Sequence, residues 1–210
     1  MANKNKKTQI QQANQRKIKQ QQYEAATKKL FIFPCIAVGL SILVLLLFFV
    51  HFADVYNTAS NSLEFAVNGW TFFVAGLTGT YTSPKLASGF LAVPFYSHAQ
   101  QWTETVGTVT VIAVFVIVFN LLVQVITIFK KMHSLNVLSA VLSVVSAVLL
   151  IVCFAKSIDM NNATIISDYC NNPACEVRSY AIFPALFALG SAAVSAVATV
   201  KHLKASSLLK

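Results

Sequence analysis

Four segments of this chain are long enough and apolar enough to cross a lipid bilayer. They are residues 30–52, 107–129, 135–155 and 180–200, and none of them contains Asp, Glu, Lys or Arg. A helix of about 20 apolar residues spans the roughly 30 Å of bilayer hydrocarbon. Only 11% of all residues are charged, whereas about a quarter are charged in soluble domains. The sequence therefore predicts an all-α integral membrane protein, a tetraspan bundle of four transmembrane helices.

The distribution of basic residues predicts the orientation of these helices. Thirteen of the 16 Lys and Arg residues lie in residues 1–29, the link 130–134 and residues 201–210. The loops 53–106 and 156–179 hold the other three, together with six of the seven acidic residues. Cytoplasmic segments are enriched in Lys and Arg. We therefore expect a multi-pass plasma-membrane protein with both termini in the cytoplasm and two extracytoplasmic loops.

Residues 1–29 form a basic tail rich in Gln, Lys and Asn, which has too little apolar surface to fold alone. A weak helix running into the first span is compatible with Ile10, Ile18 and Ala25. The tail either only sets the orientation or is attracted to anionic lipid. The net charge of +9 could also suggest a nucleic-acid partner. We expect none, because no aromatic residues or motif accompany the lysines.

The first loop contains the stretch LEFAVNGWTFFVAG, residues 63–76. Asn-Gly between two β-prone runs is a strong hairpin signal. A turn at residues 68 and 69 would place six apolar side chains on one face: Leu63, Phe65, Val67, Trp70, Phe72 and Val74. We expect a β-hairpin outside the membrane. Its apolar face is either the core of a small ectodomain, covered by residues 89–96, or a docking surface.

The second loop contains YCNNPAC, with Cys170 and Cys175 on the oxidising side of the predicted membrane. A Pro-containing turn separates them, so the sequence predicts a disulfide bond. A redox-active pair is the alternative. The structural role is favoured, because the spacing is Cys-x4-Cys rather than Cys-x-x-Cys.

The second span carries a polar stripe formed by Asn120, Gln124 and Thr127. Amides are costly against lipid, so the stripe must face other helices or a wet cavity. It either joins helices by hydrogen bonds or lines a permeation path. The first interpretation is favoured, because no span contains a charged residue.

Small residues recur at helical spacing in the third and fourth spans. Such residues let two helices approach closely, so we expect these spans to pack as a tight pair. The residues are Ser139, Ser143 and Ser146 in the third span and Ala188, Ala192 and Ala196 in the fourth.

No pattern in the sequence indicates a catalytic site, a metal site or a cofactor. His51 and Asp54 could share a helical face at the outer end of the first span, but nothing fixes a ligand spacing for a metal. We therefore expect a protein that is not an enzyme.

The overall plan resembles that of claudin-type tetraspan proteins. It combines a cytoplasmic amino terminus, a first external loop with strand character, a tight inner link and a shorter second loop. The segment GWTFFVAGL has a tryptophan, as the Gly-Leu-Trp signature of claudins does. In claudins two cysteines follow that signature, whereas the first loop of this chain has no cysteine. The resemblance covers topology and loop proportions, and it implies no functional residue.

Two classes of function follow. In the first, the protein is an interaction, scaffold or accessory subunit that contacts a membrane-protein partner, or a second copy of itself, through its aromatic external loops. In the alternative, it is an oligomeric small-solute channel or transporter component that uses the polar stripe of the second span.

Overall fold

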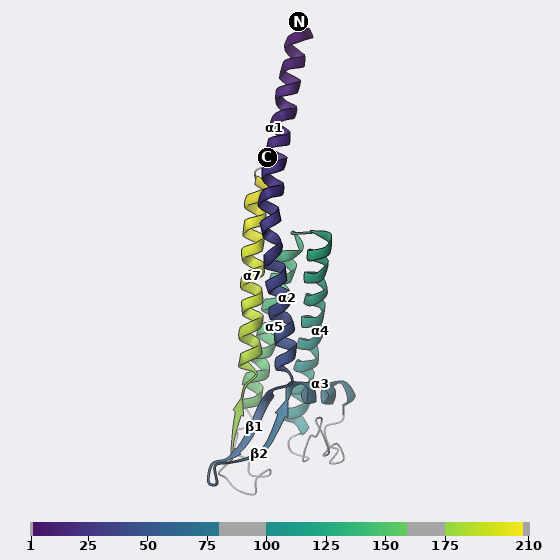
Figure 1. Ribbon diagram of the computed structural model, residues 1–210. Coiled ribbons are helices and arrows are strands. Elements are labelled where there is room, and N and C mark those ends of the chain that lie inside the picture. The colour runs from purple at the N-terminus through teal and green to yellow at the C-terminus, as the bar shows by residue number, and fades with distance from the viewer. Residues whose placement is uncertain (1, 80–99, 159–174, 208–210) are drawn as a thin grey trace.

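The computed structural model describes residues 2–79, 100–158 and 175–207 and forms a bundle of long helices with a small sheet at one end (Figure 1). Four helical stretches are long and apolar enough to cross a bilayer, which confirms that part of the prediction. The first is a continuous rod, and each of the others is a single helix. The rod consists of α1 (Ala2–Lys28), the short 3-10 helix η1 (Lys29–Phe31) and α2 (Ile32–Leu47), and the single helices are α4 (Gln100–Lys130), α5 (Leu135–Ile158) and α7 (Ile182–Ser207).

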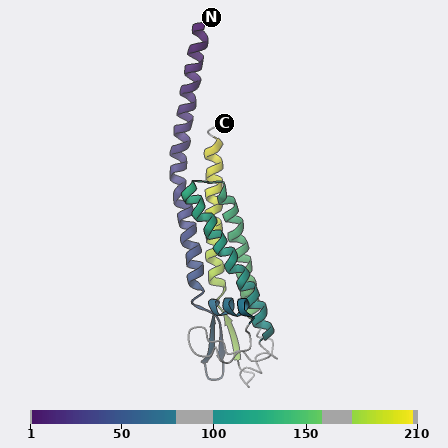
Figure 2. The same cartoon turned by 90° about the vertical axis from the view of Figure 1, so that its right-hand side faces the viewer.

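The four long helices close into a ring. Helix α5 packs against α4 and α7, and α2 also packs against α4 and α7. Successive long helices run in opposite directions, so α1 and the end of α7 lie at the end of the bundle away from the sheet (Figures 1 and 2). We call the two ends the sheet end and the link end, the latter because residues 131–134 connect α4 to α5 there.

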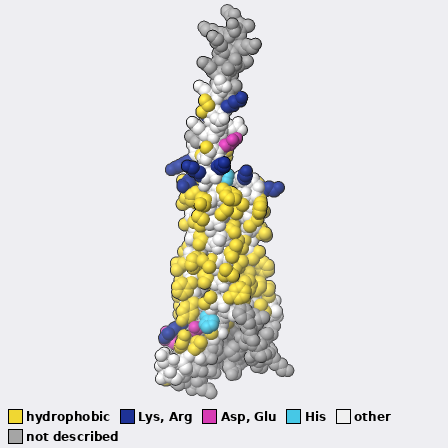
Figure 3. Space-filling model, in the orientation of Figure 1, with side chains coloured by type: hydrophobic (Ala, Val, Ile, Leu, Met, Phe, Trp, Pro, Cys, Tyr) yellow, Lys and Arg dark blue, Asp and Glu magenta, His cyan; other side chains and the backbone are white. Residues whose placement is uncertain are grey.

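The outward faces of the helices are apolar. Figure 3 shows a hydrophobic band over the face of the bundle in view, with Lys and Arg side chains gathered at its link end. A helix that is apolar on its exposed face as well as its buried face is typical of a membrane span. The exposed side chains of the band include Ile42, Leu46, Phe115, Phe119, Leu122, Val141, Val148, Leu186 and Val197.

Residues 2–28 are helical throughout, although the sequence predicts only a weak helix there. Gln, Lys and Ala have good helix propensity. Because α1 continues into η1 and α2, it also avoids the cost of starting a new helix. Its described side chains are mostly exposed, and Figure 2 shows it projecting beyond the bundle.

The sheet end is built from three antiparallel strands in the order β2-β1-β3. Strand β1 (His51–Asn57) begins shortly after α2, with residues 48–50 between them, so the helix of the predicted first span ends at Leu47 rather than at Phe52. The other strands are β2 (Ser62–Asn68) and β3 (Cys175–Ser179). Val55 of β1 lies opposite both Phe65 of β2 and Val177 of β3. The sheet therefore joins chain segments that lie more than a hundred residues apart.

The predicted hairpin with a turn at Asn68 and Gly69 is wrong. Those residues end β2 and begin α3 (Gly69–Thr78). The Asn68 Oδ1 atom accepts a hydrogen bond of 2.8 Å from the Thr71 N–H, which is the role of a helix N-cap. A Cβ atom on Gly69 would lie 2.8 Å from the rings of Phe48 and Phe52. The role of Gly69 is thus to let the rings of Phe48 and Phe52 lie close to its backbone, and not to form a turn.

The hairpin of the structure lies earlier in the chain. Strands β1 and β2 pair as neighbours and are connected by residues 58–61. Asn61 ends this connection with a φ of 50°, a conformation that Asn tolerates better than most residues. Residues 89–96, which the sequence offers as a cover for the apolar face, lie outside the described part of the chain.

Candidate functional site

A cluster of buried polar side chains lies between the four long helices. We call it the polar cluster, and all its members are at most 3% exposed. It contains the two amides of the predicted stripe, Asn120 and Gln124. Its serines come from three helices: Ser41 of α2, Ser139 and Ser143 of α5, and Ser191 and Ser195 of α7.

The amides of α4 hydrogen-bond to serines of neighbouring helices. Asn120 Nδ2 donates to Ser143 Oγ at 2.8 Å, and Gln124 Nε2 donates to Ser139 Oγ at 3.0 Å. A step of four residues along α4, from Asn120 to Gln124, moves the partner four residues back along α5, from Ser143 to Ser139. This is the register expected of antiparallel helices. Gln124 Nε2 also donates to Ser191 Oγ of α7 at 3.1 Å. One side chain therefore connects three helices.

The serines extend the cluster to two further pairs of helices, α5 with α7 and α2 with α7. Ser143 Oγ donates to Ser191 Oγ at 3.2 Å, and the hydroxyls of Ser139 and Ser195 are 3.2 Å apart. The Oγ atoms of Ser41 and Ser191 are 3.3 Å apart, which adds α2. Neither Ser41 nor Ser191 belongs to the predicted stripes. Ser41 is the one hydroxyl residue of the first span, and Ser191 lies four residues before Ser195 in the fourth.

The interior of the cluster is tightly filled. Asn120 Oδ1 and Gln124 Oε1 are buried and have no hydrogen-bond partner among the described residues. Beside Asn120, a cavity of about 10 Å³ is lined partly by Ser41, Ser143 and Ser191. This volume is about that needed for one water molecule. The cluster can therefore join helices, but it has no room for a larger solute.

Replacing Gln124 with leucine is expected to lower the free energy of unfolding by about 1–2 kcal/mol, because two interhelical hydrogen bonds are lost. The matched control is Thr127→Val. The Thr127 hydroxyl donates to Val123 O of its own helix at 2.8 Å, so its loss removes no interhelical bond and should cost less than the Gln124 change, under about 1 kcal/mol. Unfolding of both variants in mixed micelles measures the difference. Equal stability of the two variants would show that the amide does not join the helices.

The six residues of the predicted apolar face do not lie on one face of a hairpin. Val67 and Phe72 are buried, at 1% and 0% exposure, whereas Leu63 is 45% exposed. Trp70 and Val74 are half-buried on α3. Phe65 lies in β2, opposite Val55. The set is divided between β2 and α3 because the chain turns into a helix at Gly69.

Trp70 belongs to an aromatic cluster between α3 and the end of α2. Its ring centroid lies 5.7 Å from that of Phe48, 5.6 Å from Phe49 and 5.4 Å from Phe73. Its backbone N–H donates to Phe48 O at 3.2 Å. Aromatic pairs at these separations add to the stability gained from burial. Trp70 thus fixes α3 against the bundle.

The small residues of α5 and α7 lie mainly in the contact between these two helices, which is the most extensive in the bundle. Ser139, Ser143 and Ser146 are each at most 2% exposed, and Ala188 and Ala192 are 3% and 7% exposed. Ser146 donates to Leu142 O of its own helix at 2.8 Å. Ala196, by contrast, is exposed.

The predicted disulfide stays a prediction. Cys170 lies outside the described residues, and Cys175 is the first residue of β3, where it pairs through its backbone with Asn57. The two cysteines described as free, Cys35 and Cys153, lie within α2 and α5.

His51 and Asp54 lie in β1 and not on a helix. His51 Nδ1 is 3.0 Å from Asp54 Oδ1, an ion-pair distance when the imidazole is protonated, and Asp54 is 4% exposed. Within the described ranges no group of three or more His, Cys, Asp or Glu side chains is placed to hold a metal ion.

No model of a known protein family matches the chain, and neither a curated protein nor a solved structure is significantly similar to it.

Proposed function

We propose that this protein is a non-enzymatic integral membrane protein of four helices that acts as an interaction, scaffold or accessory subunit. In this proposal the apolar band lies in the bilayer, and the link end faces the cytoplasm. The support for this orientation is the group of lysines at the link end: Lys28, Lys29, Lys130, Lys131, Lys201 and Lys204.

The observation that carries the interaction role is the firm attachment of the sheet to the helices. The Tyr180 N–H donates to Phe52 O at 2.8 Å, and Ser179 Oγ donates to the same oxygen at 3.2 Å. These bonds join the end of β3, just before α7 begins at Ile182, to β1, the strand that comes after α2. A surface that is ordered before binding loses little conformational entropy on docking.

The sheet end also offers exposed side chains of mixed character. Leu63 is 45% exposed, and the side chains of Glu176 and Arg178 are about half exposed. The Arg178 guanidinium lies 4.6 Å from the centre of the Tyr56 ring. An apolar residue beside an arginine and a tyrosine is the composition found in protein interfaces. The expected contact surface is therefore this part of the sheet rather than Trp70 and Phe72, which help to hold α3 in place.

The geometry favours this role over an oligomeric channel or transporter component. A permeation path would need polar side chains that face open space. The amide N–H groups of Asn120 and Gln124 instead bond to serines, and the adjacent cavity measures about 10 Å³.

Crosslinking in native membranes followed by mass spectrometry tests the proposal. The test variant combines Leu63→Asp with Arg178→Glu. The control is Ile18→Asp, which changes a residue of similar exposure, 54%, on α1 far from the sheet. We expect one crosslinked protein, a partner or a second copy, that is lost in the test variant and kept in the control. A crosslinked protein that is retained equally in both variants would exclude the sheet as the docking surface.

A further inference from the structure

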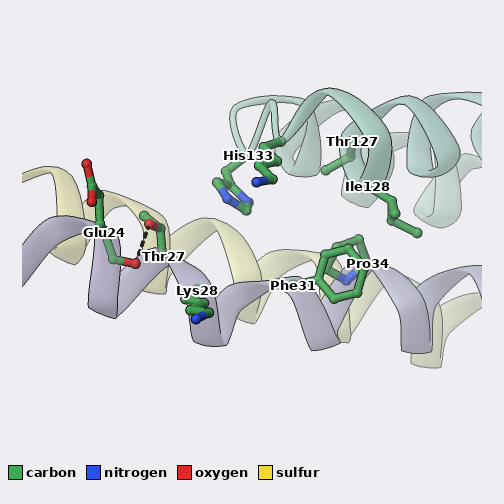
Figure 4. Close-up of a pocket in the computed structure, with 9 residues that line it drawn as sticks. Glu24, Thr27, Lys28, Phe31, Pro34, Thr127, Ile128 and His133 are labelled. Atoms are coloured by element: carbon green, nitrogen blue, oxygen red, sulfur yellow. Dashed lines mark hydrogen bonds between the residues drawn. The ribbon is translucent and has the colours of Figure 1, made fainter.

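A pocket of about 640 Å³ lies at the link end, between the rod and the α4–α5 link. We call it the link-end pocket. Its basic side is formed by Lys28, Lys131 and His133, and its apolar side by Phe31, Pro34 and Ile128. Figure 4 shows His133 reaching into the gap from the link, with Phe31 facing the gap from the rod. The volume is in the range of pockets that hold small molecules.

The polar groups of the pocket suit an anion. Glu24 is the one acidic residue that lines it, against two lysines. Partial burial, and then the nearby His202, lower the pKa of His133. An imidazole N–H and two ammonium groups are suitable donors to phosphate oxygens.

The pocket lies at the link end, where Figure 3 shows Lys and Arg side chains gathered at the edge of the apolar band. A smaller pocket of about 330 Å³ at the same end repeats the pattern, with Lys29, Lys201 and Lys204 beside Phe33. There the Lys201 Nζ atom lies 4.5 Å from the centre of the Phe33 ring. Lysines above an apolar wall are arranged to contact a molecule that is anionic at one end and apolar at the other.

We propose that the link-end pocket binds the headgroup of an anionic phospholipid. The phosphate lies between Lys28, Lys131 and His133, and the glycerol and first acyl carbons lie against Phe31, Pro34 and Ile128. This inference rests on the proposed insertion of the apolar band in a membrane. It differs from diffuse attraction of the amino-terminal helix to lipid, because two lysines and a histidine from separate segments form one site.

Native mass spectrometry of the full chain in detergent tests the inference with phosphatidylglycerol and phosphatidylcholine. The test variant combines Lys28→Gln with Lys131→Gln, and the control combines Lys17→Gln with Lys19→Gln. All four lysines are exposed, and both variants lose two positive charges. We expect tighter binding of phosphatidylglycerol than of phosphatidylcholine, weakened about 30-fold in the test variant and by less than about twofold in the control.

Three results would overturn the inference. They are equal binding of the two lipids, equal weakening in both variants, and displacement of phosphatidylglycerol by low concentrations of inorganic phosphate, which would identify a site for free phosphate. Retention of the protein in membranes after an alkaline wash separates this failure from failure of the proposed function. A protein that stays in the membrane but shows no lipid preference contradicts the pocket alone. A protein that is washed out contradicts both.

Discussion

Replacing Phe72 with alanine is expected to lower the free energy of unfolding by about 3–5 kcal/mol. Phe72 is fully buried and belongs to the hydrophobic core that also contains Phe52, Val67 and Val106. These residues come from α3, β1, β2 and α4, so the ring fills a space shared by four elements. Thermal or denaturant unfolding in mild detergent measures the loss.

Leu77→Ala is the matched control, since Leu77 lies on the same helix and is 52% exposed. We expect it to change the free energy of unfolding by no more than about 0.5 kcal/mol. Comparable losses in the two variants would mean that α3 does not bury Phe72 against α4 and the sheet. Such a result would reopen the hairpin interpretation of residues 63–76.

The four long helices could be predicted from sequence because hydrophobicity over about 20 residues is a local property. Their ends were harder to predict. The first apolar segment continues to Phe52, but the helix ends at Leu47. Phe52 is 1% exposed in the central strand of the sheet. A buried strand and a membrane helix are both apolar, so composition alone cannot divide them.

The Asn-Gly pair shows why the sheet end was predicted incorrectly. Asn is favoured both in tight turns and at helix N-caps, and Gly is favoured both at positive φ and where another group approaches closely. Here Asn68 caps α3, and Gly69 faces the rings of Phe48 and Phe52. The contacts of Gly69 join parts of the chain that are separated in sequence, and the third strand comes from residues 175–179. A local sequence pattern predicts neither the contacts nor the third strand.

The polar stripe was predicted from its spacing, but its partners required the structure. Asn120 and Gln124 fall on one face of a helix whatever surrounds them. Their bonds to Ser143 and Ser139 depend on the antiparallel register of α4 and α5. Once two helices are known to be antiparallel neighbours joined by a short link, matched spacing of amides and serines becomes a usable signal.

Replacing Gly76 with alanine is expected to destabilise the protein by about 1–3 kcal/mol. A Cβ atom on Gly76 would lie 2.5 Å from the carbonyl oxygen of Gly107 and 2.8 Å from Val111 Cγ2. The oxygen belongs to the backbone of α4 and cannot rotate away, so α3 must move off α4. The better helix propensity of alanine, worth up to about 1 kcal/mol, offsets only part of this cost. Unfolding in mild detergent measures the net effect.

A graded series of alanine variants separates this clash from any general effect of adding a methyl group. At Gly107 the nearest atom to the added carbon is Phe72 O at 3.1 Å, and at Gly39 nothing lies within 4 Å. We therefore expect the loss of stability to fall from Gly76→Ala to Gly107→Ala, with Gly39→Ala neutral or stabilising by up to about 1 kcal/mol. Equal unfolding midpoints for the Gly76 and Gly39 variants would contradict the close approach of α3 to α4. Because α3 carries Phe72 and Trp70, such a result would also contradict the packing of the sheet end against the helices, and would leave only the hydrogen bonds to Phe52 O as support for its attachment.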